Sequence, residues 1–144
     1  MKVLGIAIKK GELWFSVLDG TTKDNASIVL IDKRNFQAEQ DFTELMLCFH
    51  NLFSELITEH TPTSIGVKLS LDVDMNQIPY LHCSLGILAY ICRKSNIELT
   101  TRSIRWITGG KRKKLIECEQ LFSSHNLKNE KLHATVVALH EIEV

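Results

Sequence analysis

The pattern of apolar residues along this chain first changes its period near residue 41. Before that point, three runs of strand-forming residues, 2–9, 12–19 and about 26–33, are separated by turns at Lys10–Gly11 and Gly20–Asn25. After that point, apolar residues recur every three or four positions, which is the period of an amphipathic helix, at Phe42, Leu45, Met46, Phe49, Leu52, Phe53, Leu56 and Ile57. The chain is therefore predicted to open with an antiparallel meander of three strands, followed by a long helix.

Strands and helices alternate in the remainder of the chain. Alternating apolar residues over 65–71 predict a fourth strand, and residues 97–99 predict a short fifth strand. Helical periods predict helices at about 78–92, at about 113–122 and from 129 to about 141. This order indicates an α/β fold whose mixed five-stranded sheet is antiparallel in its first three strands, gains two parallel strands, and has helices on both faces. With 144 residues and no linker, the chain is expected to form a single domain over 1–144.

Charge and cysteine usage narrow the class of protein. Lys and Arg together number 17, as do Asp and Glu, so a chain coated with positive charge is excluded, whereas a local basic patch is not. No apolar run approaches the roughly 20 residues that a membrane-spanning helix needs, and no signal peptide precedes the first strand. The four cysteines, Cys48, Cys83, Cys92 and Cys118, form no C-x-x-C pair and are expected to be free thiols. We therefore expect a cytoplasmic protein without a membrane partner.

The order of elements resembles that of the ribonuclease H-like superfamily, and more closely that of RuvC-type Holliday-junction resolvases. Four segments carry the resemblance: Val3–Ile6, Leu52–Lys68, Ser84–Lys113 and Glu130–His140. The chain is also similar to a small bacterial family within this superfamily, through residues 5–9 and Val67–Lys68. The resemblance implies a five-stranded mixed sheet, and a site where acidic side chains bind two divalent metal ions.

The acidic positions that the resemblance implies are mostly replaced in this chain. Ala7 stands at the first-strand Asp, Lys68 at the fourth-strand Glu, and Glu130 and His133 at the two acidic positions of the last helix. Two-metal hydrolysis needs several carboxylates around a pair of ions, and a lysine at such a position repels a cation. Together with the resemblance, these replacements imply a degenerate nuclease site with no catalytic metal and no other cofactor. They argue against an enzyme but leave that question open.

One alternative is that the chain is an active, metal-dependent nuclease. Glu130 and His133, together with one of Asp19, Asp72 or Asp74, would then converge on Mg²⁺ or Mn²⁺ as an atypical nuclease site. Asp72 and Asp74 follow the fourth strand, where open α/β sheets place their sites, although a polar loop is the simpler interpretation of both.

A basic segment over 102–114 is the strongest charge cluster of the chain. It contains a tryptophan, and one interpretation is a phosphate-binding loop at the start of a helix, although the spacing of a P-loop is absent. Its members are Arg102, Arg105, Trp106, Lys111, Arg112, Lys113 and Lys114. Functionally, Trp106 would stack on a base; otherwise the cluster is a solvated helix face. In RuvC-like proteins this region approaches DNA, so the resemblance implies a nucleic-acid contact. A protein partner, or a homodimer serving as an interaction module, is the remaining alternative.

Overall fold

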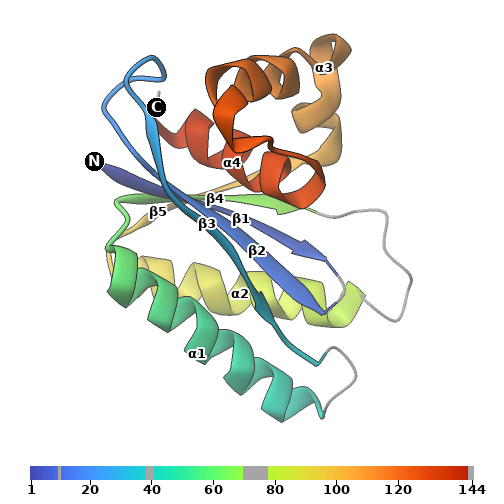
Figure 1. The fold of residues 1–144 in the computed structure, drawn as a ribbon. Helices are drawn as coiled ribbons and strands as arrows, with labels where there is room; N and C mark the ends of the chain where they lie inside the picture. The colour runs from blue at the N-terminus through green and yellow to red at the C-terminus, as the bar shows by residue number, and fades with distance from the viewer. Residues whose placement is uncertain (10, 38–40, 70–77, 143–144) are drawn as a thin grey trace.

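The computed structural model describes residues 1–9, 11–37, 41–69 and 78–142, with the side chains of 78–80 left aside (Figure 1). The elements follow the predicted order β-β-β-α-β-α-β-α-α, with one added 3-10 turn. They are β1 (Lys2–Lys9), β2 (Glu12–Asp19), β3 (Ser27–Asn35), α1 (Phe42–His60), β4 (Ser64–Leu69), α2 (Ile78–Lys94), β5 (Glu98–Ser103), α3 (Ile104–Leu121), η1 (Ser123–His125) and α4 (Asn129–Ile142).

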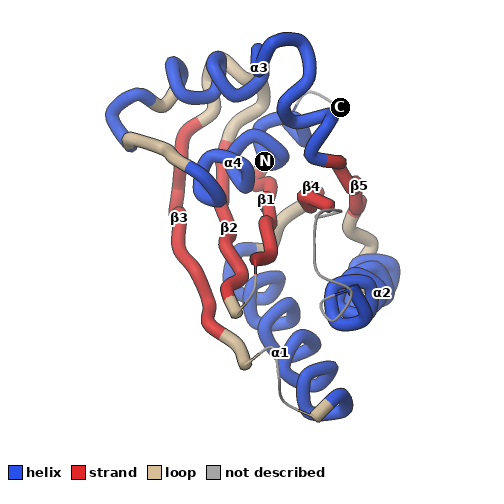
Figure 2. Tube along the Cα trace, turned by 90° about the vertical axis from the view of Figure 1, so that its right-hand side faces the viewer, coloured by secondary structure: helices blue, strands red, loops and turns tan. Residues whose placement is uncertain are grey.

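The five strands form one sheet in the order β3-β2-β1-β4-β5, visible from left to right in Figure 2. β1 pairs antiparallel with β2, and β2 with β3, while β4 and β5 extend the sheet in parallel with β1. The predicted mixed sheet is therefore confirmed. β5 is longer than the predicted 97–99, because its residues are polar and half-exposed at an edge of the sheet and lack the apolar alternation of a buried strand.

Helices cover both faces of the sheet, as predicted. α1 and α2 lie below it and α3 and α4 above it in the orientation of Figure 1. The lower layer is apolar, with Phe49, Phe53 and Leu56 of α1 packed under Phe15 and Ile65 of the sheet. The upper layer forms a second apolar cluster. In it, α3 and α4 meet Val3, near the start of β1, and Leu18, near the end of β2.

Glycines let α4 approach the sheet very closely. A Cβ added at Gly5 of β1 would lie 1.8 Å from the carbonyl oxygen of Ala134, and one at Gly66 of β4 would lie 2.6 Å from that of Val137. Thr135 of α4 also donates a hydrogen bond of 3.0 Å to the buried Ser16 hydroxyl of β2. These contacts hold α4 against β1, β2 and β4, which sets where its first turn projects.

The helix predicted at about 113–122 begins earlier, and it is kinked. α3 starts at Ile104, where the Ser103 hydroxyl accepts a hydrogen bond of 3.2 Å from the Trp106 amide. Residues 109–112 then leave helical geometry, and Gly110, Lys111 and Arg112 have φ values of 62°, 57° and 64°. The left-handed region costs a residue with a side chain about 1–2 kcal/mol. Residues 109–112, within the basic segment, therefore form a strained loop between two helical stretches.

Two further expectations can be compared with the described residues. All four cysteines are free thiols, and burial raises the pKa of Cys92 to about 11 and that of Cys118 to about 12. Both therefore pack as apolar groups rather than acting as nucleophiles. Within the described ranges, no helix has the length and apolar character required to cross a membrane.

Candidate nucleic-acid interface

A single row of residues crosses all five strands near the carboxyl ends of β1, β4 and β5. The strand registers pair Lys33 of β3 with Trp14 of β2, Trp14 with Ala7 of β1, Ala7 with Lys68 of β4, and Lys68 with Arg102 of β5. Paired residues on neighbouring strands point to the same side of a sheet. Three cations, one tryptophan and one alanine therefore share the face that α4 covers.

The ammonium group of Lys68 lies at the centre of this row and contacts the first turn of α4. Its Nζ is 3.1 Å from Oε2 and 3.3 Å from Oε1 of Glu130, and 2.9 Å from Nδ1 of His133. The Lys68 and Glu130 side chains are 11% and 15% exposed, so solvent screens this ion pair only partly. The structure thus brings together Ala7, Lys68, Glu130 and His133, the four positions singled out in the sequence.

The imidazole of His133 is held neutral in this cluster. Burial lowers its pKa first, and the nearby charges of Lys68 and Arg112 lower it further against the opposing effect of Glu130. An ammonium group can only donate, so Nδ1 of His133 accepts the hydrogen bond from Lys68 and the ring proton resides on Nε2. The charge of Arg112, in the kink of α3, thus acts on this end of α4.

The residues present at this position do not fit a divalent metal ion. The lysine ammonium already occupies the space between the Glu130 carboxylate and the His133 imidazole, and it carries a positive charge. Ala7 is fully buried and offers no ligand atom. Across the described part of the chain, no three His, Cys, Asp or Glu side chains come together as a metal site would require.

The structure separates Asp19 from the other residues of the alternative metal site. β2 runs antiparallel to β1, so Asp19 at its end pairs with Lys2 at the start of β1, while Trp14 pairs with Ala7. The Asp19 carboxylate instead binds the amino terminus at 3.1 Å. The antiparallel direction of β2 thus carries Asp19 to the opposite end of the strands from Ala7, whereas Glu130 and His133 contact Lys68, the partner of Ala7 on β4. Asp72 and Asp74 lie outside the described residues.

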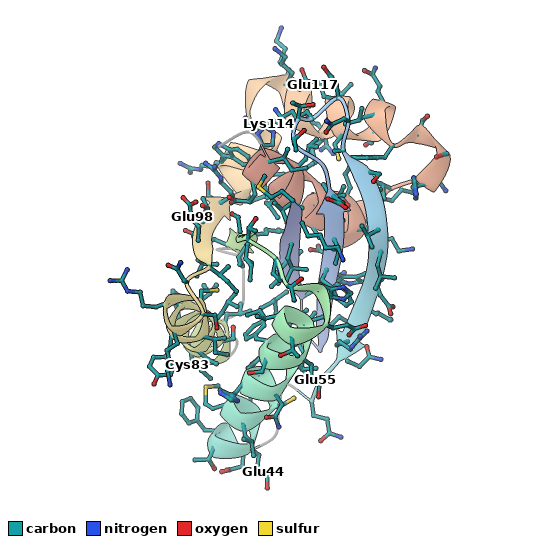
Figure 3. The ribbon with its side chains drawn as sticks, turned by 90° about the vertical axis from the view of Figure 1, so that its left-hand side faces the viewer. Glu44, Glu55, Cys83, Glu98, Lys114 and Glu117 are labelled. Atoms are coloured by element: carbon teal, nitrogen blue, oxygen red, sulfur yellow. The ribbon has the colours of Figure 1, made fainter. Side chains whose placement is uncertain are left out.

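The predicted basic residues lie on β5 and α3, beside the Lys68 cluster. Arg105, Lys111, Arg112 and Lys113 are exposed, and Lys114 is half-buried. Figure 3 shows Lys114 and Glu117 on α3 at one end of the molecule, with Glu44 and Glu55 of α1 at the other. α1 contains Glu44, Glu55 and Glu59 and no Lys or Arg, so the net charge of zero conceals a basic and an acidic side.

The Trp106 ring is already contacted by cations of its own chain. The Arg102 guanidinium lies 4.3 Å and the Lys114 ammonium 4.7 Å from the ring centroid, and His140 meets the ring edge-on at 4.9 Å. Nε of Arg102 is buried with no hydrogen-bond partner among the described residues. The ring faces that the sequence interpretation assigned to a stacked base therefore carry cations instead.

Three residues of this surface escaped the sequence interpretation. Trp14 lies next to Ala7, and its ring is contacted by Lys33 at 5.3 Å and by Lys131 at 5.8 Å. Lys131 could have been noticed as the neighbour of Glu130. The grouping of Trp14 with Lys33 depends on the register between β2 and β3, for which the sequence holds no local signal.

Comparison with known proteins identifies the fold. No protein-family model and no curated protein sequence matches the chain. Among solved structures, Thermus thermophilus RuvC is similar with a TM-score of 0.78 and 13% identity, over 99% of this chain and 94% of that one. The yeast mitochondrial Holliday junction resolvase Ydc2 is similar with a TM-score of 0.66 and 12% identity, over 97% of this chain and 78% of that one. A Fowlpox virus resolvase, solved in a complex with Holliday junction DNA, has a TM-score of 0.65 and 11% identity, over 98% of each chain. This chain therefore has a RuvC-like fold of the ribonuclease H-like type, as the sequence resemblance implied.

Proposed function

We propose that this chain is a non-catalytic ribonuclease H-like domain that binds nucleic acid through its phosphate groups. The observation that carries the proposal is the Lys68 ammonium, which lies between Glu130 and His133 where the resemblance implies a metal ion. A lysine supplies positive charge for a phosphate but cannot lower the pKa of a bound water as a divalent ion does. The site is thus unsuited to hydrolysing a phosphodiester, and we assign phosphate binding to the exposed cations beside it, among them Lys111 and Arg112.

The neutral state of His133 supports the absence of hydrolysis. A general base must be free to take a proton from the attacking water. Nδ1 of His133 is already engaged by Lys68, and Glu130 is paired with the same ammonium. Neither of these two groups is therefore available as an unpaired base next to a phosphate.

The basic segment supports contact with a polyanion. Lys111 and Arg112 are exposed on the strained loop, Lys113 is exposed directly after it, and the charge of Arg112 lowers the pKa of His133. Strained backbone tends to occur at binding sites, where the surrounding structure maintains it. Two structural neighbours, Thermus thermophilus RuvC and the Fowlpox virus resolvase, were solved with Holliday junction DNA, which makes branched duplex DNA the first ligand to test.

A salt-dependent titration tests the binding. Fluorescence anisotropy with four-way junction, duplex and single-stranded probes is expected to show binding that weakens as salt increases, because bound phosphates release counterions. The pair Lys111→Glu and Arg112→Glu should weaken it about ten-fold or more and flatten the salt dependence. The matched control is Arg93→Glu with Lys94→Glu, the same charge change on exposed residues of α2, which should leave affinity nearly unchanged. Failure of the wild-type protein to bind any probe at low salt would refute the proposal.

A cleavage assay tests the loss of catalysis. The wild-type protein, incubated with a four-way junction and Mg²⁺ or Mn²⁺, is expected to leave the DNA intact. Glu130→Gln removes the counter-charge of Lys68, so this variant should bind the same probe more tightly than the wild type. Metal-dependent cleavage that Glu130→Gln abolishes would instead establish the atypical nuclease and overturn the non-catalytic assignment.

A further inference from the structure

The two tryptophans of the chain lie on opposite sides of Lys68, and each is contacted by two cations. On the β2 side, Trp14 is contacted by Lys33 and Lys131; on the β5 side, Trp106 is contacted by Arg102 and Lys114. Trp14 and Arg102 belong to the same row across the sheet as Lys68. Both tryptophans are half-buried, so each packs against the domain and is also partly exposed to solvent.

The first turn of α4 links the two clusters. Glu130 extends to Lys68 on β4, while the next residue, Lys131, extends to Trp14 on β2. These two contacts straddle β1, whose Ala7 occupies the position between them with only a methyl group. The helix thus places one more cation on the β2 side of the site than the strands alone would provide.

The cations on the rings make base stacking unfavourable. Each ring already has two cations within 4.3 to 5.8 Å of its centroid, so a base that stacks on a face with a cation must displace that cation. A cation-π contact contributes about 0.5–2 kcal/mol, and stacking a base on an aromatic ring contributes about 1–3 kcal/mol. Exchanging one contact for the other therefore yields little binding energy. A base-paired duplex avoids this exchange, because it presents phosphates and keeps its bases stacked on one another.

We propose that Trp14, Lys33 and Lys131 form a second phosphate-binding patch, an inference that rests on the proposed function. The ligand is a duplex, and its backbone runs from this patch to Arg102 and Lys114. From β3 to β5 the row is about 19 Å wide, since neighbouring strands lie about 4.8 Å apart. That width corresponds to roughly five to six nucleotides of one duplex strand, which rises about 3.4 Å per nucleotide along the helix axis. Each tryptophan holds its lysines or arginine in place, so less side-chain freedom is lost when they contact a phosphate.

The decisive variant removes charge from the second patch only. Lys33→Gln combined with Lys131→Gln should weaken binding to a short duplex about ten-fold and reduce the slope of log affinity against log salt by about two, one for each lysine. Both side chains are exposed, so the domain should remain folded, which circular dichroism would verify. Arg93→Gln with Lys94→Gln, on exposed positions of α2, removes the same charge elsewhere and should change neither quantity.

A second measurement tests the preference for duplex. The wild-type protein is expected to bind the duplex about ten-fold or more tightly than either separated strand, and Trp14→Phe should retain most of the duplex affinity. If the lysine variant binds like the wild type while Lys111→Glu with Arg112→Glu loses affinity, this inference fails and the proposed function stands. Equal or tighter binding of single strands, abolished by Trp106→Leu, would overturn the inference in favour of stacking. Absence of binding to every probe would overturn both.

Discussion

The two faces of the sheet are built from different chemistry. Below the sheet, α1 packs with Phe49, Phe53 and Leu56, which are almost completely buried against apolar strand residues. Above it, α4 approaches glycine backbone and carries polar pairs, among them Thr135 with Ser16. Both layers have an apolar cluster, but the upper layer also buries polar side chains, which hydrogen bonds hold at defined positions. The candidate interface lies on the upper face.

The upper face is itself divided along α4. At its carboxyl end, Glu141 is 3% exposed, and its Oε2 accepts a hydrogen bond of 2.7 Å from the Ser64 hydroxyl. At its amino end, Glu130 and His133 meet Lys68 close to the basic loop of α3. Among the described residues, the amino end carries the exposed Lys131 and is affected by the charge of Arg112 of α3, so we assign binding to that end and a structural role to the other.

The largest expected effect comes from separating α4 from the sheet. Gly5→Ala places a Cβ against the carbonyl oxygen of Ala134, which belongs to helix backbone and cannot turn aside. We expect a loss of more than about 4 kcal/mol in the free energy of unfolding, together with weaker nucleic-acid binding, because the first turn of α4 moves away from Lys68. Urea denaturation and anisotropy would measure the two quantities. Wild-type stability in this variant would contradict the close approach.

A core substitution on the lower face should reduce stability alone. Phe53→Ala leaves a cavity where an almost fully buried ring packed under the sheet, and should cost about 3–5 kcal/mol. Binding by the fraction that remains folded should match the wild type, because the cations lie on the other face. If Phe53→Ala instead impaired binding as strongly as Gly5→Ala, the assignment of binding to the upper face alone would be refuted.

Breaking the partly buried ion pair should have a smaller effect. Lys68→Met leaves the Glu130 carboxylate without its partner and should cost about 1–3 kcal/mol, and the double variant with Glu130→Gln should recover part of that loss. The exposed pair of Lys33 and Glu12, at 2.9 Å, is the control and should show a coupling below about 1 kcal/mol. A double-mutant cycle in urea measures both couplings. Equal coupling in the two pairs would argue against the special position of Lys68.

The smallest expected effect is a change in pH dependence. Since the pKa of folded His133 lies below its ordinary value of about 6.5, the unfolded chain binds a proton first as pH falls, and stability declines below that pH. His133→Gln cannot titrate, so its melting temperature should fall less than that of the wild type between neutral and mildly acidic pH. Parallel melting curves for the two proteins would show that His133 does not titrate in the way its contacts with Lys68 and Arg112 imply.

The sequence predicted the lower face better than the upper one. Apolar residues of α1 repeat with the helical period, so its existence and its buried side followed from local pattern. The kink of α3 was missed: a helix was predicted only at about 113–122, and the left-handed Lys111 and Arg112 before it were not predicted. A non-glycine residue adopts that conformation only when distant contacts impose it, and distant contacts leave no local sequence signal.

The sequence by itself determined the order of strands and helices, the mixed sheet, and the identities of Ala7, Lys68 and His133, because periodicity and residue identity are local properties. Only the tertiary structure decided three relations. The Lys68 ammonium contacts Glu130, Asp19 lies at the opposite end of the strands from Ala7, and Trp14 shares a row with Arg102. Those relations depend on strand register and on how closely α4 approaches the sheet. Register and helix position result from packing between residues far apart in the chain, which no single segment encodes.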